Sequence, residues 1–199
     1  MQQIILASGS SSRKVIMDSL GIDYIVIPAD INEKEIRDDN PAVQAEKIAR
    51  AKAEYVAQSH DGIVIAADTF GVCDGTVLEK PKTLDEAREM LKLQSNKECQ
   101  TYTGFCYIDK ANNIDFSETV TIKYTFRDLS EEEIDRFVKN NPVTDWSAAF
   151  NLRDSYQMGF IKKIDGSLTG ITNGLPVELL IPCLQKSGVK FFTKKDFLR

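Results

Sequence analysis

Short apolar stretches alternate with amphipathic helical patterns along the first third of the chain, and this alternation restricts the fold more than any other feature. Strand-like stretches lie at 3–7, 23–28 and 63–67, with helical patterns at about 11–20 and 41–59. Strands separated by helices in this way are typical of parallel pairing. The pattern therefore predicts an α/β fold in which at least part of the sheet is parallel.

The middle of the chain has a different character. Residues 100–108 and 114–126 are rich in Thr, Tyr, Phe, Val and Ile, and they flank a turn-like cluster at 109–113. This arrangement predicts a long antiparallel hairpin. Other elements are expected as helices at 84–93, 130–140 and 176–187 and as strands at 158–165 and 189–192. Together these elements predict one mixed sheet with helices around it, arranged in two lobes.

Capping residues mark the start of two of these helices. Asn40 and Pro41 have the residue types favoured at the N-cap and at the first helical position. Thr83 and Glu86 form a capping-box pattern at the start of the next helix.

Composition excludes several classes of function. The 199 residues suffice for one domain, and the net charge of −5 argues against a general nucleic-acid binder, which needs a basic face. No signal peptide is visible, and no apolar run approaches the roughly 20 residues of a membrane span. His60 is the only histidine, which nearly excludes a histidine zinc site or a Ser-His-Asp triad. The cysteines form no C-x-x-C pair, so we expect reduced thiols in a cytoplasmic protein: Cys73, Cys99, Cys106 and Cys183.

The stretch LASGSSSRK at residues 6–14 joins a short apolar strand to a helix. Backbone N–H groups converge at such a turn, at the positive end of the helix dipole, where a phosphate can bind. Serine is also a common N-cap residue, so ordinary capping is the alternative. Arg13 and Lys14 favour an anion.

Charged residues in unexpected places suggest the rest of a site. Lys52 falls on the apolar stripe of the 41–59 helix, where it either extends its ammonium to solvent or faces an anion in a cleft. Asp68 ends an apolar strand, at the edge where open α/β sheets bind ligands, although Asp also forms turns and caps. Glu79-Lys80-Pro81-Lys82 is either a solvated loop or a further anion contact.

These residues fit one chemistry. The serine turn, Arg13, Lys52 and Lys80 supply positive potential for a polyphosphate, and Asp68 with an acidic partner can hold a divalent cation. The pattern is that of a metal-assisted phosphoanhydride hydrolase.

Several short motifs, in order along nearly the whole chain, resemble the Maf family of nucleoside triphosphate pyrophosphatases, which is related in fold to the inosine triphosphatases. The matching segments are Leu6-Ala7-Ser8-Gly9-Ser10, Asp30-Ile31-Asn32-Glu33, Ala49-Arg50-Ala51-Lys52-Ala53, Ala67-Asp68-Thr69, Glu79-Lys80-Pro81, Tyr102-Thr103-Gly104, Thr125-Phe126-Arg127-Asp128-Leu129 with Glu132-Glu133-Ile134, Ile164-Asp165-Gly166-Ser167 and Gly174-Leu175-Pro176. Each motif is weak alone, and their order and spacing make the resemblance specific.

The resemblance implies a single Maf-like domain over residues 1–199, an elongated mixed β-sheet flanked by helices, with two lobes and a central cleft as in inosine triphosphatases. It implies hydrolysis of an ordinary pyrimidine or a modified nucleoside triphosphate to the monophosphate and pyrophosphate, with Mg²⁺ or Mn²⁺, by a homodimer. The implied catalytic residues are Asp68, Glu33, Lys52 and Lys80, with Glu33 and Asp68 as metal ligands. The implied substrate-binding residues are Ser8, Ser10, Ser12, Arg13, Thr69 and Arg153.

The chain also departs from the family pattern. Ser11 and Ser12 stand where the family usually has Pro and Arg in S-P-R-R. Within 147–154, Ala148 and Arg153 replace the Gly and Gln of A-G-A-Y-x-I-Q-G, and Trp146 replaces the preceding Lys. Ser12, Thr69 and Arg153 align with positions that set substrate choice in the family, and one hypothesis is that Arg153 takes over from the arginine missing at position 12.

We therefore expect an active nucleoside triphosphate pyrophosphatase with shifted base preference. The first alternative is a nucleotide-binding or regulatory protein that has lost catalysis, because the recognition segment is altered. The second is an interaction protein without a nucleotide site. The sequence does not indicate the preferred base, the sugar, the oligomeric state or the biological role.

Overall fold

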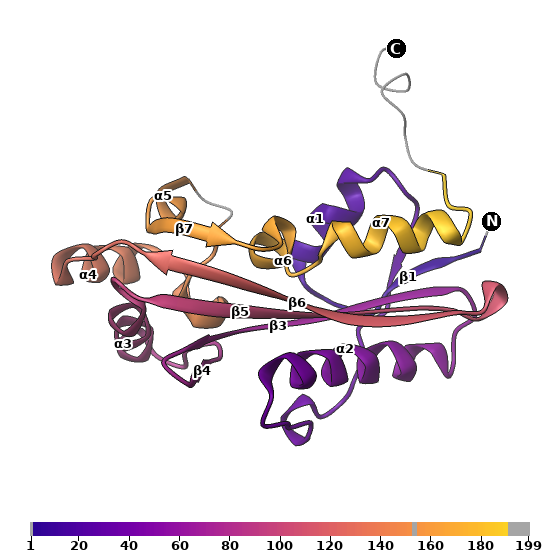
Figure 1. The fold of residues 1–199 in the computed structure, drawn as a ribbon, viewed down its shortest axis with the longest axis horizontal. Helices are drawn as coiled ribbons and strands as arrows, with labels where there is room; N and C mark the ends of the chain where they lie inside the picture. The colour runs from indigo at the N-terminus through magenta and orange to yellow at the C-terminus, as the bar shows by residue number, and fades with distance from the viewer. Residues whose placement is uncertain (1, 153–154, 191–199) are drawn as a thin grey trace, which may run out of the picture. The chain divides into compact units, whose positions relative to one another are not determined.

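The computed structural model describes residues 2–152 and 155–190 and has a mixed α/β fold (Figure 1). The seven-stranded sheet has the order β2-β1-β3-β5-β6-β7, with β4 paired to β3. β1 is parallel to β2 and β3, whereas β4 is antiparallel to β3 and β7 is antiparallel to β6. The predicted mixed sheet with a parallel part is thus confirmed.

The strands are β1 (Ile4–Leu6), β2 (Ile25–Val26), β3 (Ile63–Cys73), β4 (Thr76–Leu78), β5 (Glu98–Asp109), β6 (Ile114–Phe126) and β7 (Ile161–Asp165). The α-helices are α1 (Ser11–Ser19), α2 (Pro41–Ala57), α3 (Leu84–Gln94), α4 (Glu131–Asn140), α5 (Ser155–Met158), α6 (Leu168–Asn173) and α7 (Val177–Lys186). Short 3-10 helices are η1 (Glu33–Glu35), η2 (Lys110–Asn112), η3 (Val143–Asp145) and η4 (Ser147–Ala149).

The chain divides into two compact units. Unit 1 comprises the residues up to Asp68, Thr103–Val120 and the segment from Asn173, and unit 2 comprises Thr69–Tyr102 and Thr121–Thr172. Strands β3, β5 and β6 each contribute residues to both units.

The central strands of the unit 1 sheet are buried on both faces, which explains the continuous apolar runs of β1 and of residues 63–67 of β3. Helix α2 covers one face and helices α1 and α7 cover the other (Figure 1). Side chains of a strand alternate between the two faces. Within β3, Val64 and Ala66 pack with α2, and Ile63 and Ile65 pack with α1 and α7.

Gly104 permits α2 to approach β5 closely. A Cβ atom at this position would lie 2.1 Å from the carbonyl oxygen of Ala45, which is far too close for any side chain. The glycine of the Tyr102-Thr103-Gly104 motif therefore has a packing role within unit 1.

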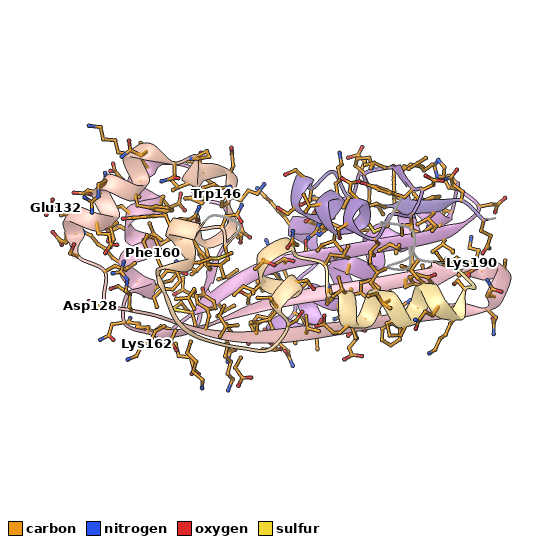
Figure 2. All side chains as sticks on the ribbon, turned by 90° about the horizontal axis from the view of Figure 1, so that it is seen from above. Asp128, Glu132, Trp146, Phe160, Lys162 and Lys190 are labelled. Carbon is orange, nitrogen blue, oxygen red and sulfur yellow. A yellow bond between two sulfur atoms is a disulfide. The ribbon has the colours of Figure 1, made fainter. Side chains whose placement is uncertain are left out.

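Unit 2 has its own apolar core, in which α3 and α4 pack on aromatic side chains of the sheet. Phe160 is fully buried, and Trp146 packs at the edge of this core (Figure 2). The ring centroid of Trp146 lies 6.4 Å from that of Phe137. Aromatic contacts of this kind add to the area that the core removes from water.

The two N-cap predictions are confirmed, but the capping box is only half formed, because the Glu86 side chain accepts from the N–H of Lys82 and not from that of Thr83. The side chain of Asn40 accepts a hydrogen bond from the N–H of Ala42 at 3.0 Å, with Pro41 at the first helical position. The hydroxyl of Thr83 accepts from the N–H of Glu86 at 3.1 Å.

Two strand predictions are wrong in extent. β3 does not end at residue 67 but continues to Cys73, because β4 forms an antiparallel ladder with Gly71, Val72 and Cys73. The final strand expected at 189–192 is absent at Val189 and Lys190, where the chain has turned out of α7 past Gly188. Residues 191 and 192 lie outside the described residues.

The expectation that all cysteines are reduced is wrong for Cys73 and Cys99. These residues lie on neighbouring strands, β3 and β5, with Cα atoms 4.5 Å apart, and they form a disulfide. Cys106 and Cys183 are free and buried. Sequence spacing could not show the pair, because the two strands are brought together only by the sheet order.

Among residues 2–152 and 155–190, the longest apolar helices are too short or too polar to cross a bilayer.

Candidate active site

Asp68 and Lys52 meet because Asp68 lies on the face of β3 that packs against α2, and Lys52 lies on the face of α2 that packs against β3. Asp68 follows Val64 and Ala66 on the face of β3 that α2 covers, and Lys52 lies on the buried face of α2. The Nζ atom of Lys52 donates a hydrogen bond to Oδ1 of Asp68 at 2.8 Å. Lys52 is 7% exposed and Asp68 is 9% exposed. The ammonium of Lys52 therefore does not extend to solvent but pairs with a carboxylate inside unit 1.

Glu33 supplies a second carboxylate to the same ammonium. It begins the 3-10 helix η1, and its Oε2 atom lies 3.0 Å from Nζ of Lys52. The side chain of Glu33 is 47% exposed, unlike that of Asp68. The cluster of Glu33, Lys52 and Asp68 thus has one buried and one solvent-facing carboxylate around a single cation.

The serine turn carries a buried arginine. Nη1 of Arg13 donates to Oγ of Ser8 at 2.8 Å, and the N–H of Ser10 donates to the same oxygen at 3.3 Å. Ser10 occupies the N-cap position of α1, but its side chain makes no capping hydrogen bond. Ordinary capping by Ser10 is therefore not the reason for the hydroxyl at this position.

The loop before α7 holds Arg13 from the other side, a role that sequence reasoning did not assign. Nε of Arg13 donates to the carbonyl oxygen of Gly174 at 2.9 Å, and the side chain of Asn173 donates to the carbonyl of Ser12 at 3.1 Å. Gly174 has φ +65°, which favours glycine. The Gly174-Leu175-Pro176 motif was the available signal, although it does not reveal which side chain it contacts.

The electrostatics of unit 1 connect these two groups. Burial lowers the pKa of the Arg13 guanidinium, and the negative charges of Asp68 and Glu33 partly oppose this effect. Arginine remains protonated in proteins, so the guanidinium is a fixed positive charge. Arg13 and Lys52 together balance the charges of Glu33 and Asp68, so these four residues taken together are close to neutral.

Four further residues were predicted for the site: Ser12, Thr69, Lys80 and Arg153. Thr69 and Lys80 belong to unit 2, and Lys80 is exposed. Ser12 is half-buried in the first turn of α1. Arg153 lies outside the described residues.

The donor set suits a hard cation. Among the described residues no three His, Cys, Asp or Glu side chains gather as a ready-made metal site. Glu33 and Asp68 nevertheless already share one cation, the Lys52 ammonium, and both offer oxygen ligands. Mg²⁺ is commonly bound by one or two carboxylates together with substrate phosphates. The residues present therefore fit such an ion in the presence of a phosphate ligand.

Comparison with known proteins shows the family to which this chain belongs. The family model described as Maf-like protein matches residues 3–187. The chain belongs to the Maf family. A relative from Syntrophomonas wolfei, named dTTP/UTP pyrophosphatase, is 37% identical over 92% of this chain and 96% of its own length. Relatives of the same name from Geobacter sp. strain M21 and Pyrococcus furiosus are each 33% identical over 93% of this chain and 95% of their own length.

A solved structure has the same fold. The Staphylococcus aureus Ham1 protein matches with a TM-score of 0.56 and 16% identity, over 94% of this chain and all of that one. At this identity the likeness concerns the fold alone.

One departure of this Maf chain from the family motif falls at a strained backbone position. Ala148 has φ +57° and ψ 18°, in the left-handed region that favours glycine, and Ala149 has φ +60°. The glycine of the motif would adopt this conformation without the strain that a Cβ causes.

Proposed function

We propose that this chain hydrolyses a pyrimidine nucleoside triphosphate to the monophosphate and pyrophosphate at the cluster of Glu33, Lys52 and Asp68. The activity is supported by full-length relatives that are each named dTTP/UTP pyrophosphatase. The observation that carries the proposal is the buried Lys52 ammonium, which lies 2.8 Å from Asp68 and 3.0 Å from Glu33. A desolvated cation between two carboxylates is costly as a structural feature, and it is expected where charge changes during a reaction.

The serine turn binds phosphate oxygens in this proposal. Arg13 supplies a fixed positive charge, and the hydroxyls of Ser8 and Ser10 and the first N–H groups of α1 supply hydrogen-bond donors. The contacts from Gly174 and Asn173 hold the turn and Arg13 in place before substrate arrives. Such preorganised donors stabilise the charge that develops on the phosphoryl oxygens.

Asp68 acts as the general base. Its carboxylate accepts a proton from a water molecule, whose oxygen forms a bond to the α-phosphorus. The bond between the α-phosphorus and the bridging oxygen breaks, and pyrophosphate leaves with the electron pair. Lys52 orients the Asp68 carboxylate and neutralises charge on the equatorial oxygens.

Glu33 and Asp68 would hold Mg²⁺ or Mn²⁺ together with the substrate phosphates. When bound, such an ion polarises the phosphoryl oxygens and offsets the charge of the triphosphate. Arg13, Lys52, Glu33 and Asp68 are together close to neutral, so they leave the negative charge of the triphosphate largely uncompensated. A bound divalent cation would supply the missing positive charge, which supports this part of the proposal.

The remaining predicted residues keep their proposed roles on the strength of the family resemblance. Lys80 would bind phosphate, and Ser12, Thr69 and Arg153 would influence the choice of base. A homodimer, a cytoplasmic location and the absence of a nucleic-acid partner also stay predictions.

Pyrophosphate release from a panel of normal and modified nucleoside triphosphates tests the proposal. We expect turnover of dTTP or UTP with Mg²⁺ or Mn²⁺, and a loss of at least about a hundredfold in kcat for Asp68→Asn. Asp61→Asn, an exposed carboxylate just before the same strand, is the matched control and should retain wild-type activity. Nucleotide binding without turnover by the folded wild-type chain would contradict the proposal and favour a binding-only protein.

A further inference from the structure

A polar network lies inside the apolar core of unit 2. Gln94, the last residue of α3, is fully buried, and Tyr124 of β6 is 1% exposed. The hydroxyl of Tyr124 donates to Oε1 of Gln94 at 2.7 Å. Burial raises the pKa of the Tyr124 phenol, so the hydroxyl keeps the proton that it donates. Buried polar groups are normally hydrogen-bonded in native structures, and Tyr124 and Gln94 meet this requirement by bonding to each other.

The side-chain amide of Gln94 also forms a hydrogen bond to the turn at Ser147–Ala149. Its Nε2 atom donates to the carbonyl oxygen of Ala148 at 2.9 Å and to that of Met90 at 2.9 Å. Ala148 and Ala149 both have left-handed backbone conformations, which are strained for alanine because of its Cβ. Such a conformation persists only where neighbouring groups hold it. The hydrogen bond from Gln94 is the buried side-chain contact that does so.

The turn at Ser147–Ala149 also forms hydrogen bonds to the end of β4 and the residue after it, just before Lys80. The N–H of Ala148 donates to the carbonyl of Glu79 at 3.1 Å, and Oγ of Ser147 donates to the carbonyl of Leu78 at 2.8 Å. Gly71 leaves space for the turn, because a Cβ there would lie 3.3 Å from that of Ala148. A continuous path of contacts therefore runs from Tyr124 through Gln94 and Ala148 to the backbone next to Lys80, all within unit 2.

We propose that Gln94, oriented by Tyr124, is a positioning residue that acts through the turn at Ser147–Ala149 on Lys80. The inference rests on the proposed function, which assigns Lys80 to the triphosphate. A phosphate-binding lysine on an exposed segment binds well only if its backbone is held, since a preorganised group loses less freedom when the phosphate binds. Gln94 contacts no substrate, and its effect is entirely on the segment that carries Lys80.

The variant Gln94→Met removes both donors while keeping most of the side-chain volume. We expect the KM for the triphosphate to rise about tenfold with kcat changed less than about threefold, since a ground-state phosphate contact is weakened. The double variant Gln94→Met with Tyr124→Phe leaves no unpaired phenol and should stay folded with the same kinetic change. Hydrogen exchange of the Ala148 N–H should become faster in both.

A double-mutant cycle with Lys80→Gln separates positioning from a general structural role. If Gln94 acts through Lys80, then Gln94→Met changes KM by less than about twofold in the Lys80→Gln background. An equal rise of KM in both backgrounds would overturn the inference, as would an unchanged KM in a chain with wild-type Lys80. Tyr107→Phe, which removes another buried tyrosine hydroxyl but in unit 1, is the matched control and should leave KM unchanged.

The wild-type chain is measured first. Absence of turnover with every nucleotide would contradict the proposed function and remove the basis of this inference with it. Turnover by the wild type with no effect of Gln94→Met would contradict the positioning role alone.

Discussion

Lys52 is the residue at which local pattern and chemistry disagree most clearly. Its position on the apolar face of α2 requires burial, and a buried ammonium without partners would destabilise the chain. The two carboxylates at 2.8 and 3.0 Å resolve this conflict. Sequence periodicity predicted the unusual position of Lys52. Asp68 was predicted from an expected strand end, and that reason was wrong because β3 continues past Asp68 to Cys73. Neither could show that the two side chains bond to each other.

We expect a large effect of Lys52→Gln on catalysis. The substitution removes a fixed positive charge beside Asp68, so kcat should fall about 10²–10³-fold, the range seen when one oxyanion-stabilising donor is lost. Steady-state kinetics with saturating metal measure the loss. Arg50→Gln is the control on the same helix, because Arg50 pairs with Asp115 and is partly exposed. Similar activity losses in the two variants would contradict the role of Lys52.

Sequence reasoning at the level of single residues reached a limit in two places. Arg13 was assigned to phosphate, but its bond to Gly174 joins residues 161 apart in the chain, and no local pattern shows such a contact. The disulfide between Cys73 and Cys99 was missed for the same reason, since only the neighbouring positions of β3 and β5 bring the sulfurs together.

At the level of elements, helix starts were predicted well and strand ends poorly. Caps such as Asn40 and Thr83 act within one turn of helix, so the sequence contains all the relevant information. The end of β3 depends instead on its pairing with β4, which a linear pattern does not contain.

The disulfide between β3 and β5 stabilises unit 2. Closing a loop with a sequence separation of 26 residues is worth ~3.5 kcal/mol in the chain-entropy model. Reductant should therefore lower the urea midpoint of unfolding. Thiol titration of the denatured chain should find two free thiols without reductant, those of Cys106 and Cys183, and four with it. Four free thiols in the absence of reductant would contradict the pairing.

Asp109 links three elements of unit 1 at the end of β5. Burial raises the pKa of this carboxyl, but hydrogen bonds from Asn112, Ser187 and Gln2 outweigh burial and lower it below its ordinary value. Its contribution to stability is therefore complete above the unfolded-state pKa of about 3.9 and is lost as pH falls through the lower folded-state pKa.

Replacing this carboxylate should change the acid dependence of stability. Asp109→Asn should lower the free energy of unfolding at pH 7 by about 1–3 kcal/mol, because an amide cannot accept all of these bonds. Urea titrations should show a smaller difference from wild type at about pH 2 than at pH 7. Asp39→Asn, an exposed carboxylate, should show no such convergence. A difference for Asp109→Asn that is independent of pH would contradict the role of its hydrogen bonds.

For the whole molecule, the mixed sheet was predictable because continuous apolar strands and alternating helices determine it with little ambiguity. In unit 1, α2 covers one side of the sheet and α1 and α7 cover the other, and this explains why β1 and residues 63–67 of β3 lack alternating polar residues (Figure 1). The division into units within single strands was not readable from composition, since no linker marks it.

In the proposed function, this Maf family chain breaks the bond between the α-phosphorus of a nucleoside triphosphate and its bridging oxygen. Turnover in water labelled with heavy oxygen, followed by mass spectrometry of the products, tests which bond breaks. We expect nucleoside monophosphate and pyrophosphate in equal amounts, with the label in the monophosphate, and loss of both products in Asp68→Asn. Release of orthophosphate and nucleoside diphosphate, or label found in pyrophosphate alone, would contradict it.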